Sequence, residues 1–212
     1  MQIVKIERQK RRKDSFQIIP DTGDPFFSDA LTMSNFDIYK GKELSVSEFN
    51  EFKSASELRS IKDYCLYLLS LKMYTVSDIR KKLYNRYDNR ELSQKAIEDL
   101  LDLGILDDEK FTALYVQTLV RYNKYSIKEI RYKLMQKGLS KDLVELYTVA
   151  DQLGDTYEQD VAVKLAQKKW KSLQNNKDTT QKKREKLFQF LARKGFSFDL
   201  VKKIVEFVVN GM

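Results

Sequence analysis

The stretch Lys137–Val144 (KGLSKDLV) returns almost unchanged as Lys194–Val201 (KGFSFDLV). The lysine, glycine, serine, aspartate, leucine and valine coincide, and an amphipathic segment lies on each side of both copies. Self-similarity of this kind is typical of repeat architectures, in which short helical units stack and bury a shared core. The sequence therefore predicts tandem helical units with an elongated surface, and it disfavours a single catalytic pocket.

The segment before the first copy also recurs. Ser126–Leu134 (SIKEIRYKL) follows the same pattern as the earlier Thr75–Leu83 (TVSDIRKKL). Its first serine and Glu129 have the spacing of a capping box, in which the hydroxyl accepts from the backbone and the carboxylate reaches back. We expect a helix that ends at Lys137, with Gly138 in the left-handed conformation behind it.

A third, more divergent version precedes the second copy. In the segment before Gly195, Leu187 and Leu191 stand where Ile130 and Leu134 stand before Gly138. The pattern thus predicts the same middle helix in each of three units.

Each unit also opens with a longer helix, because apolar residues recur at the i, i+3, i+4 and i+7 spacing of one helical face. The predicted faces are Ile61, Tyr64, Cys65, Leu68 and Leu69; then Phe111, Leu114, Tyr115, Thr118, Leu119 and Tyr122; then Ala162, Leu165, Ala166, Trp170 and Leu173. Closing helices are expected from about Ser93, Ser140 and Ser197, and the last one carries the stripe Val201, Ile204, Val205 and Val208.

The predicted fold class is mainly α, with three tandem three-helix repeats and a small strand-containing N-terminal module. The repeats are expected over residues 58–106, 107–153 and 154–212, with Gly104 and Gly154 at the ends of the first two. Both prolines, Pro20 and Pro25, precede the predicted helices. Helices this short are marginal alone in water, so each repeat requires a small core.

The first 57 residues have a different pattern. Ile3–Ile6 and Phe16–Ile19 have the composition of short strands, and Phe36–Tyr39 is expected to be a third. The basic run Lys10–Lys13 would form the hairpin tip between the first two. A short helix is expected to begin after Ser45, and the module would pack on the first repeat, since a hairpin alone is barely stable.

Charge favours an acidic partner. The formal net charge is +8, and basic residues gather on the first and second helices of the later repeats. The segment Arg121–Lys141 holds seven basic residues and one acid, and Lys164–Lys186 holds nine and two. Nucleic acid, an anionic membrane or an acidic protein surface would each suit this balance, and ordinary solvated faces are the alternative.

Catalytic chemistry has little support in this composition. The chain has no histidine, the commonest general base and metal ligand, and its seven glycines form no phosphate-binding loop. Asp107 and Asp108 are better explained as helix capping than as metal ligands. We therefore expect a protein that is not an enzyme and binds neither a cofactor nor a metal.

Cys65 is the only cysteine, so no internal disulfide is expected, and its place on an apolar face predicts a buried thiol. The sequence contains no apolar run long enough to span a bilayer and no apolar stretch behind its charged start. These features predict a cytoplasmic protein without a membrane partner.

Several segments together resemble the RecX family of bacterial recombinase regulators, over roughly residues 58–210. The first is Gly104–Asp108 (GILDD), followed by Phe111. The second is Ser126–Leu139, which contains Ile127, Ile130, Leu134 and the tripeptide Lys137-Gly138-Leu139. The others are the pair Lys168-Lys169 and Leu191–Ser197 (LARKGFS). Their order and spacing carry the resemblance. The family usually has a glycine just before the second-repeat helix, where this chain has Tyr125, and that puts the local geometry in doubt.

The resemblance implies three three-helix repeats in an elongated curved array that binds RecA in the groove of its filament on single-stranded DNA (ssDNA). It further implies damped ATP hydrolysis, strand exchange and co-protease activity, and so a role in recombination, DNA repair and the SOS response. The residues themselves leave inhibition and stimulation of the recombinase both open. A monomer is expected.

The side chains expected to contact the filament are Arg80, Lys82, Lys128, Arg131, Lys133, Lys137, Lys168, Lys169, Arg193 and Lys194. The alternative is a protein that binds nucleic acid directly, since three-helix units resemble helix-turn-helix modules and the net charge suits phosphate contacts. Weak binding to ssDNA or duplex DNA would fit either reading.

Overall fold

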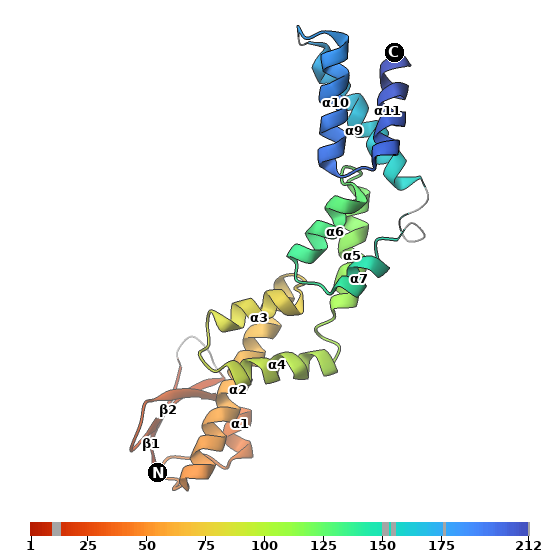
Figure 1. Cartoon of the computed structure of the whole chain (residues 1–212). Coiled ribbons are helices and arrows are strands. Elements are labelled where there is room, and N and C mark those ends of the chain that lie inside the picture. Colours follow the sequence, from red (N-terminus) through yellow and green to blue (C-terminus); the bar gives the residue numbers. More distant parts are fainter. Residues whose placement is uncertain (10–13, 150–152, 154–155, 176, 212) are drawn as a thin grey trace. The chain divides into compact units, whose positions relative to one another are not determined.

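The computed structural model describes residues 1–9, 14–149, 153, 156–175 and 177–211. The chain folds as two compact units, Met1–Asp107 and Asp108–Met212. Figure 1 shows the order of their elements along the chain. The mainly helical fold class with a small N-terminal sheet is confirmed, whereas the predicted repeat boundaries stay a prediction.

The N-terminal sheet is an antiparallel meander in the order β1-β2-β3. Its strands are β1 (Ile3–Arg8), β2 (Ser15–Pro20) and β3 (Phe26–Asp29). The predicted hairpin tip at Lys10–Lys13 lies outside the described residues. The sheet packs on α1 (Ala30–Asn35) and on the next helix, and their shared core contains Ile3, Ile18, Ile38, Leu44, Phe49 and Phe52.

The predicted third strand at Phe36–Tyr39 is wrong, because Phe26–Asp29 forms that strand instead. Asp29 ends the strand and caps α1, accepting hydrogen bonds from the N–H groups of Leu31 and Thr32. Phe36–Tyr39 then follows the end of this helix, with Asp37 at a positive φ of 50°. Ile38 is therefore apolar because it is buried just after a helix. The alternation of apolar and polar residues alone does not distinguish such a segment from a strand.

The helix expected after Ser45 does begin there, but it is not short, because α2 runs unbroken over Val46–Leu71. It begins with a capping box of Ser45 and Glu48, and the segment up to Leu71 has neither proline nor glycine. Phe49 and Phe52 fill the module's core near the start of α2, while Ile61, Cys65 and Leu68 fill a second core farther along. One helix thus joins the N-terminal sheet to the first three-helix bundle.

That first bundle is completed by α3 (Val76–Tyr84) and α4 (Arg90–Asp102). Ile79 and Leu83 of α3 and Ala96, Ile97 and Leu100 of α4 pack against the buried face of α2. The closing helix begins after Asn89, whose side chain caps it, one turn earlier than the start expected at Ser93. Ser93 is instead a buried residue inside the helix.

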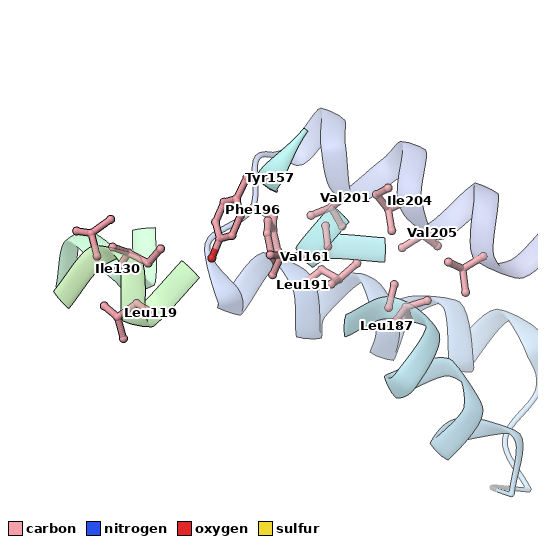
Figure 2. Packing of buried hydrophobic residues seen from close by; sticks show 14 of the residues in the cluster. Leu119, Ile130, Tyr157, Val161, Leu187, Leu191, Phe196, Val201, Ile204 and Val205 are labelled. Carbon is pink, nitrogen blue, oxygen red and sulfur yellow. The ribbon is translucent and has the colours of Figure 1, made fainter. Parts of the chain in front are cut away.

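The second unit contains two further bundles that share one core (Figure 2). The first is formed by α5 (Asp108–Arg121), α6 (Ile127–Gln136) and α7 (Lys141–Leu146), and the second by α9 (Tyr157–Gln174), α10 (Thr180–Lys194) and α11 (Phe198–Asn210). In Figure 2, Tyr157 and Phe196 are the labelled side chains of the second bundle that lie nearest to Leu119 and Ile130 of the first. We call these two sets the α5–α7 bundle and the α9–α11 bundle.

Local signals around the middle helices are confirmed. Ser126 and Glu129 form the predicted capping box, and Ser140 and Ser197 cap α7 and α11. Gly138 follows α6 with a φ of 73°. Gly104 and Gly195 also have positive φ, whereas Gly154 lies outside the described residues.

The apolar faces are confirmed for α2, α9 and α11, but not for α5. There Leu114 is 43% exposed and Tyr122 is 58% exposed, whereas Thr112 and Val116 are buried. The Thr112 hydroxyl donates to the Asp108 carbonyl at 2.6 Å, so this polar side chain enters the core with its hydrogen bond satisfied. The buried face of α5 is therefore rotated from the one that apolar spacing predicted.

Over the part of the chain that the structure describes, no helix combines the length and hydropathy needed to cross a bilayer. Cys65 is buried in the first bundle, and this burial raises the pKa of its thiol to about 11.

Candidate partner-binding site

Eight of the ten predicted contact residues lie in the second unit. Lys128, Arg131 and Lys133 are on α6 with Lys137 at its end, Lys168 and Lys169 are on α9, and Arg193 and Lys194 are on α10. Arg80 and Lys82 lie on α3 in the first unit. Lys128, Arg131, Lys168 and Arg193 are exposed, whereas the other six are half-buried.

The surface of α6 is oriented by its buried side. Ile130 and Leu134, one turn apart, are both fully buried and hold the helix against the core. The opposite side therefore faces solvent, and it carries Lys128, Tyr132 and Met135. Tyr132 is 62% exposed, so α6 presents a ridge in which apolar and cationic side chains alternate.

Arg131 is committed to contacts within the protein. Its Nε donates to the Thr148 hydroxyl at 2.8 Å, and that hydroxyl donates to the Val144 carbonyl at 2.6 Å. The carboxylate of Glu158 on α9 lies near enough for its charge to interact with Arg131. Arg131 thus connects α6 with the end of α7 and the start of α9, which leaves it less available to a partner than Lys128.

Glu158 has an unusual environment for a carboxylate. Burial raises its pKa above the ordinary value, although the charge of Arg131 and a hydrogen bond from the Ile127 N–H both act to lower it. The Ile127 N–H is one of the unpaired donors at the start of α6, so a carboxylate from α9 satisfies a helix terminus in the neighbouring bundle.

Lys194 is likewise held inside the protein. Its Nζ donates to Glu129 Oε1 at 2.8 Å, and its carbonyl accepts from the Ser126 hydroxyl at 2.5 Å. These bonds tie the last residue of α10 to the first turn of α6. We therefore remove Lys194 from the proposed partner surface and regard it as a structural residue.

Three other candidates lie over aromatic rings. Lys82 lies 5.4 Å from the centre of the Tyr74 ring, and Lys169 lies 5.6 Å from that of Phe190. Lys133 has the same relation to Tyr125. Such contacts hold the ammonium groups near the surface in defined positions without neutralising their charge.

Tyr125, which stands where a glycine is usual in the resembling family, does not disturb the turn. Its backbone is not among those with positive φ, and the left-handed position is taken by Asn123, with a φ of 48°. Asparagine tolerates this conformation better than most residues do. The Tyr125 carbonyl accepts from the hydroxyl of Tyr157 at 2.9 Å, so the tyrosine takes part in the contact between the two bundles.

Ser126, Glu129, Tyr157 and Glu158 connect the two bundles, although the sequence pattern does not predict this role. The spacing of Ser126 and Glu129 predicts only a helix cap, because their further partners lie more than 60 residues away. Glu158 lies in the first turn of α9, a position where acids are common in any helix. Local spacing contains no signal for such long-range polar contacts.

A cleft between the bundles is lined by Ile127, Lys128, Arg131, Thr148, Val149, Glu158, Gly195 and Ser197. It contains one carboxylate that is already hydrogen-bonded, two cations and no nucleophile with an adjacent base. Among the described residues, no three histidine, cysteine or acidic side chains gather in a way that would hold a metal ion.

Comparison with known proteins gives concordant matches. The model of the RecX second three-helix domain matches residues 107–146, and that of the third matches residues 155–205. A protein described as regulatory protein RecX from Clostridium perfringens (strain SM101) is 29% identical over 209 residues, which cover 98% of this chain and 96% of the relative. The regulatory protein RecX from Lactobacillus johnsonii is 32% identical over 152 residues, which cover 71% of this chain and 56% of the relative.

Solved structures agree with these matches. A crystal structure of regulatory protein RecX has a TM-score of 0.75 and 28% identity, and the match covers 96% of this chain and 98% of that one. RecX from Lactobacillus salivarius, at 24% identity and a TM-score of 0.63 over 73% of this chain and 97% of that one, shows likeness of fold.

Proposed function

We propose that this chain, a member of the RecX family of regulatory proteins, is a regulator of RecA and acts by binding the RecA–ssDNA filament along its groove. In this proposal it bridges neighbouring RecA protomers and inhibits ATP hydrolysis, strand exchange and co-protease activity in recombination and the SOS response. It does so as a cytoplasmic monomer and without turnover of its own.

The observation that carries the proposal is the presence of exposed cations on successive bundles of one chain. Lys128 on α6 and Lys168 on α9 are both exposed and belong to neighbouring bundles. A filament repeats the same surface at regular intervals, so basic sites on linked bundles would be occupied together. Linked weak contacts give a combined affinity well above that of each alone, and opposite charge speeds their formation.

The direct test is ATP hydrolysis by the cognate RecA on ssDNA, titrated with this protein. We expect inhibition by the unsubstituted chain. The double variant Lys128→Glu/Lys168→Glu should need about tenfold more protein for the same inhibition, because two contacts become repulsive. Its melting temperature should be nearly unchanged, since both side chains are exposed.

Lys95→Glu is the matched control. Lys95 is an exposed lysine on α4 beside the acids of that helix, and it does not belong to the proposed surface. The control should inhibit as the unsubstituted chain does. Equal inhibition by the double variant would remove these lysines from the binding surface, and an absence of any effect on RecA would remove the proposal.

Direct binding of nucleic acid is a second candidate, favoured by the exposed tyrosines beside the basic residues. Tyr122 and Tyr132 are largely exposed, and Lys124 lies 5.0 Å from the centre of the Tyr122 ring. Bases of single strands stack on such rings while lysines contact phosphates. A salt titration of ssDNA and duplex binding without RecA tests this: tight, sequence-dependent duplex binding would favour it over filament binding.

A further inference from the structure

Three polar contacts join the start of α6 to the α9–α11 bundle, in addition to the hydrophobic core that the two bundles share. The Ser126 hydroxyl donates to the Lys194 carbonyl, the Lys194 ammonium donates to Glu129, and the Tyr157 hydroxyl donates to the Tyr125 carbonyl. These contacts join α9 and α10 to the two residues just before α6 and to the first turn of that helix. We call this set of five residues the polar joint.

Glu129 is the central residue of the polar joint because each of its oxygens has a different partner. Oε2 accepts from the Ser126 N–H at 3.2 Å and so completes the capping box, while Oε1 accepts from Lys194 Nζ at 2.8 Å. The same conformation of the Glu129 side chain therefore both caps α6 and binds the end of α10. A change in the position of α10 would disturb the cap, and the reverse also holds.

Gly195 brings the two bundles into close contact beside this ion pair. With a φ of 92°, it follows Lys194, and a Cβ atom there would lie 2.6 Å from Cδ of Lys128. The stem of Lys128 therefore rests against the turn between α10 and α11. Because Lys128 belongs to the proposed partner surface, the turn that directly follows the joint residue Lys194 orients one cation of that surface.

We infer that Glu129 and Lys194 are positioning residues for partner binding, which fix the α9–α11 bundle relative to α6. The inference rests on the proposed function. An ion pair that remains about one-third exposed contributes little to the free energy of unfolding. Its effect lies in selecting one orientation of the two bundles, so that the basic side chains of α6 and α9 meet their partner sites at a fixed separation.

The test measures the distance between two spin labels, at Glu145→Cys on α7 and Gln189→Cys on α10, in the full chain with Cys65→Ala. Both labelled positions are exposed. Lys194→Met keeps the apolar stem but removes the charge, Lys194→Arg keeps the charge, and Lys203→Met removes an exposed lysine of α11 outside the joint. The same variants without labels are measured for affinity to RecA–ssDNA filaments.

We expect Lys194→Met to broaden the distance distribution and weaken filament binding about tenfold, while its melting temperature changes little. Lys194→Arg should restore both properties, and Lys203→Met should change neither. An unchanged distribution in Lys194→Met would overturn the inference, as would a broadened distribution with unchanged affinity. If the unsubstituted chain binds no filament, the proposed function fails and this role fails with it, whatever the distances show.

Discussion

The ammonium group of Lys133 lies 4.7 Å from the centre of the Tyr125 ring. The ring belongs to the residue just before the helix cap, and the lysine lies about two turns into α6. Lys82 and Tyr74 have the same relation at α3, and at α10 the corresponding positions hold the ion pair of Lys186 and Asp178. A lysine thus contacts the entry segment of the middle helix in all three bundles.

This contact predicts a measurable coupling between Tyr125 and Lys133. A double-mutant cycle with Tyr125→Leu and Lys133→Met should give a coupling of about 0.5–1 kcal/mol in urea unfolding, the magnitude of a cation–π pair at a surface. The matched cycle replaces Lys133 with Lys141, an exposed lysine at the start of α7 that is ion-paired with Glu145. Equal coupling in the two cycles would contradict the assignment.

Leu134→Ala and Leu191→Ala should each lower the free energy of unfolding by about 2–5 kcal/mol, because both side chains are fully buried in the core of the second unit. Met135→Ala serves as the control, since the neighbouring methionine is 61% exposed. Chemical denaturation monitored by circular dichroism measures all three. A loss below about 1 kcal/mol at either leucine would show that the core is packed differently.

Gly195→Ala should destabilise the protein more than Gly104→Ala does. Both glycines have positive φ, which costs an alanine about 1–2 kcal/mol. Around Gly104 a new Cβ would meet nothing within 4 Å, whereas at Gly195 it would displace the Lys128 stem. Parallel unfolding experiments measure the difference, and equal costs would indicate that Lys128 moves aside freely.

Tyr157 should make the protein sensitive to alkaline pH. Burial raises the pKa of its hydroxyl to about 12, with the nearby charges of Glu129 and Glu158 acting in the same direction. Above the ordinary pKa of about 10, the unfolded chain loses this proton while the folded chain retains it, so stability falls as pH rises from about 10 to 12.

Tyr157→Phe removes this titration, although it also removes the hydrogen bond to the Tyr125 carbonyl. The variant should therefore be less stable at neutral pH, and its disadvantage should shrink between about pH 10 and 12. Denaturant unfolding at a series of pH values gives the comparison. A difference between the two proteins that stays constant over this range would contradict the raised pKa.

Cys65 should resist thiol reagents while the protein is folded. With a pKa of about 11 and a fully buried side chain, it supplies very little thiolate at pH 8. A maleimide should label it only after denaturant is added, whereas an added Glu145→Cys on the surface of α7 should react at once. Rapid labelling of Cys65 in the native chain would place it outside the core.

The features that sequence predicted well are those decided within a few residues. The helix start after Ser45, the capping box at Ser126 and the left-handed conformation of Gly138 depend on backbone groups three or four positions away. The buried faces of α9 and α11 follow from helical periodicity. Recurrence of these local signals was enough to predict mainly helical bundles in tandem and to reveal the RecX resemblance.

Tertiary structure decided which side chains are buried where the local patterns were ambiguous. Ile38 is buried in a turn and not in a strand, and Thr112 enters the core of the second unit while Leu114 stays at the surface. In the same way, Lys194 meets Glu129 only in the folded chain. A lysine that was expected to bind the partner therefore makes a contact within the protein. Such outcomes depend on which groups meet across long stretches of chain, because burial and charge pairing are properties of the assembled core and not of local spacing.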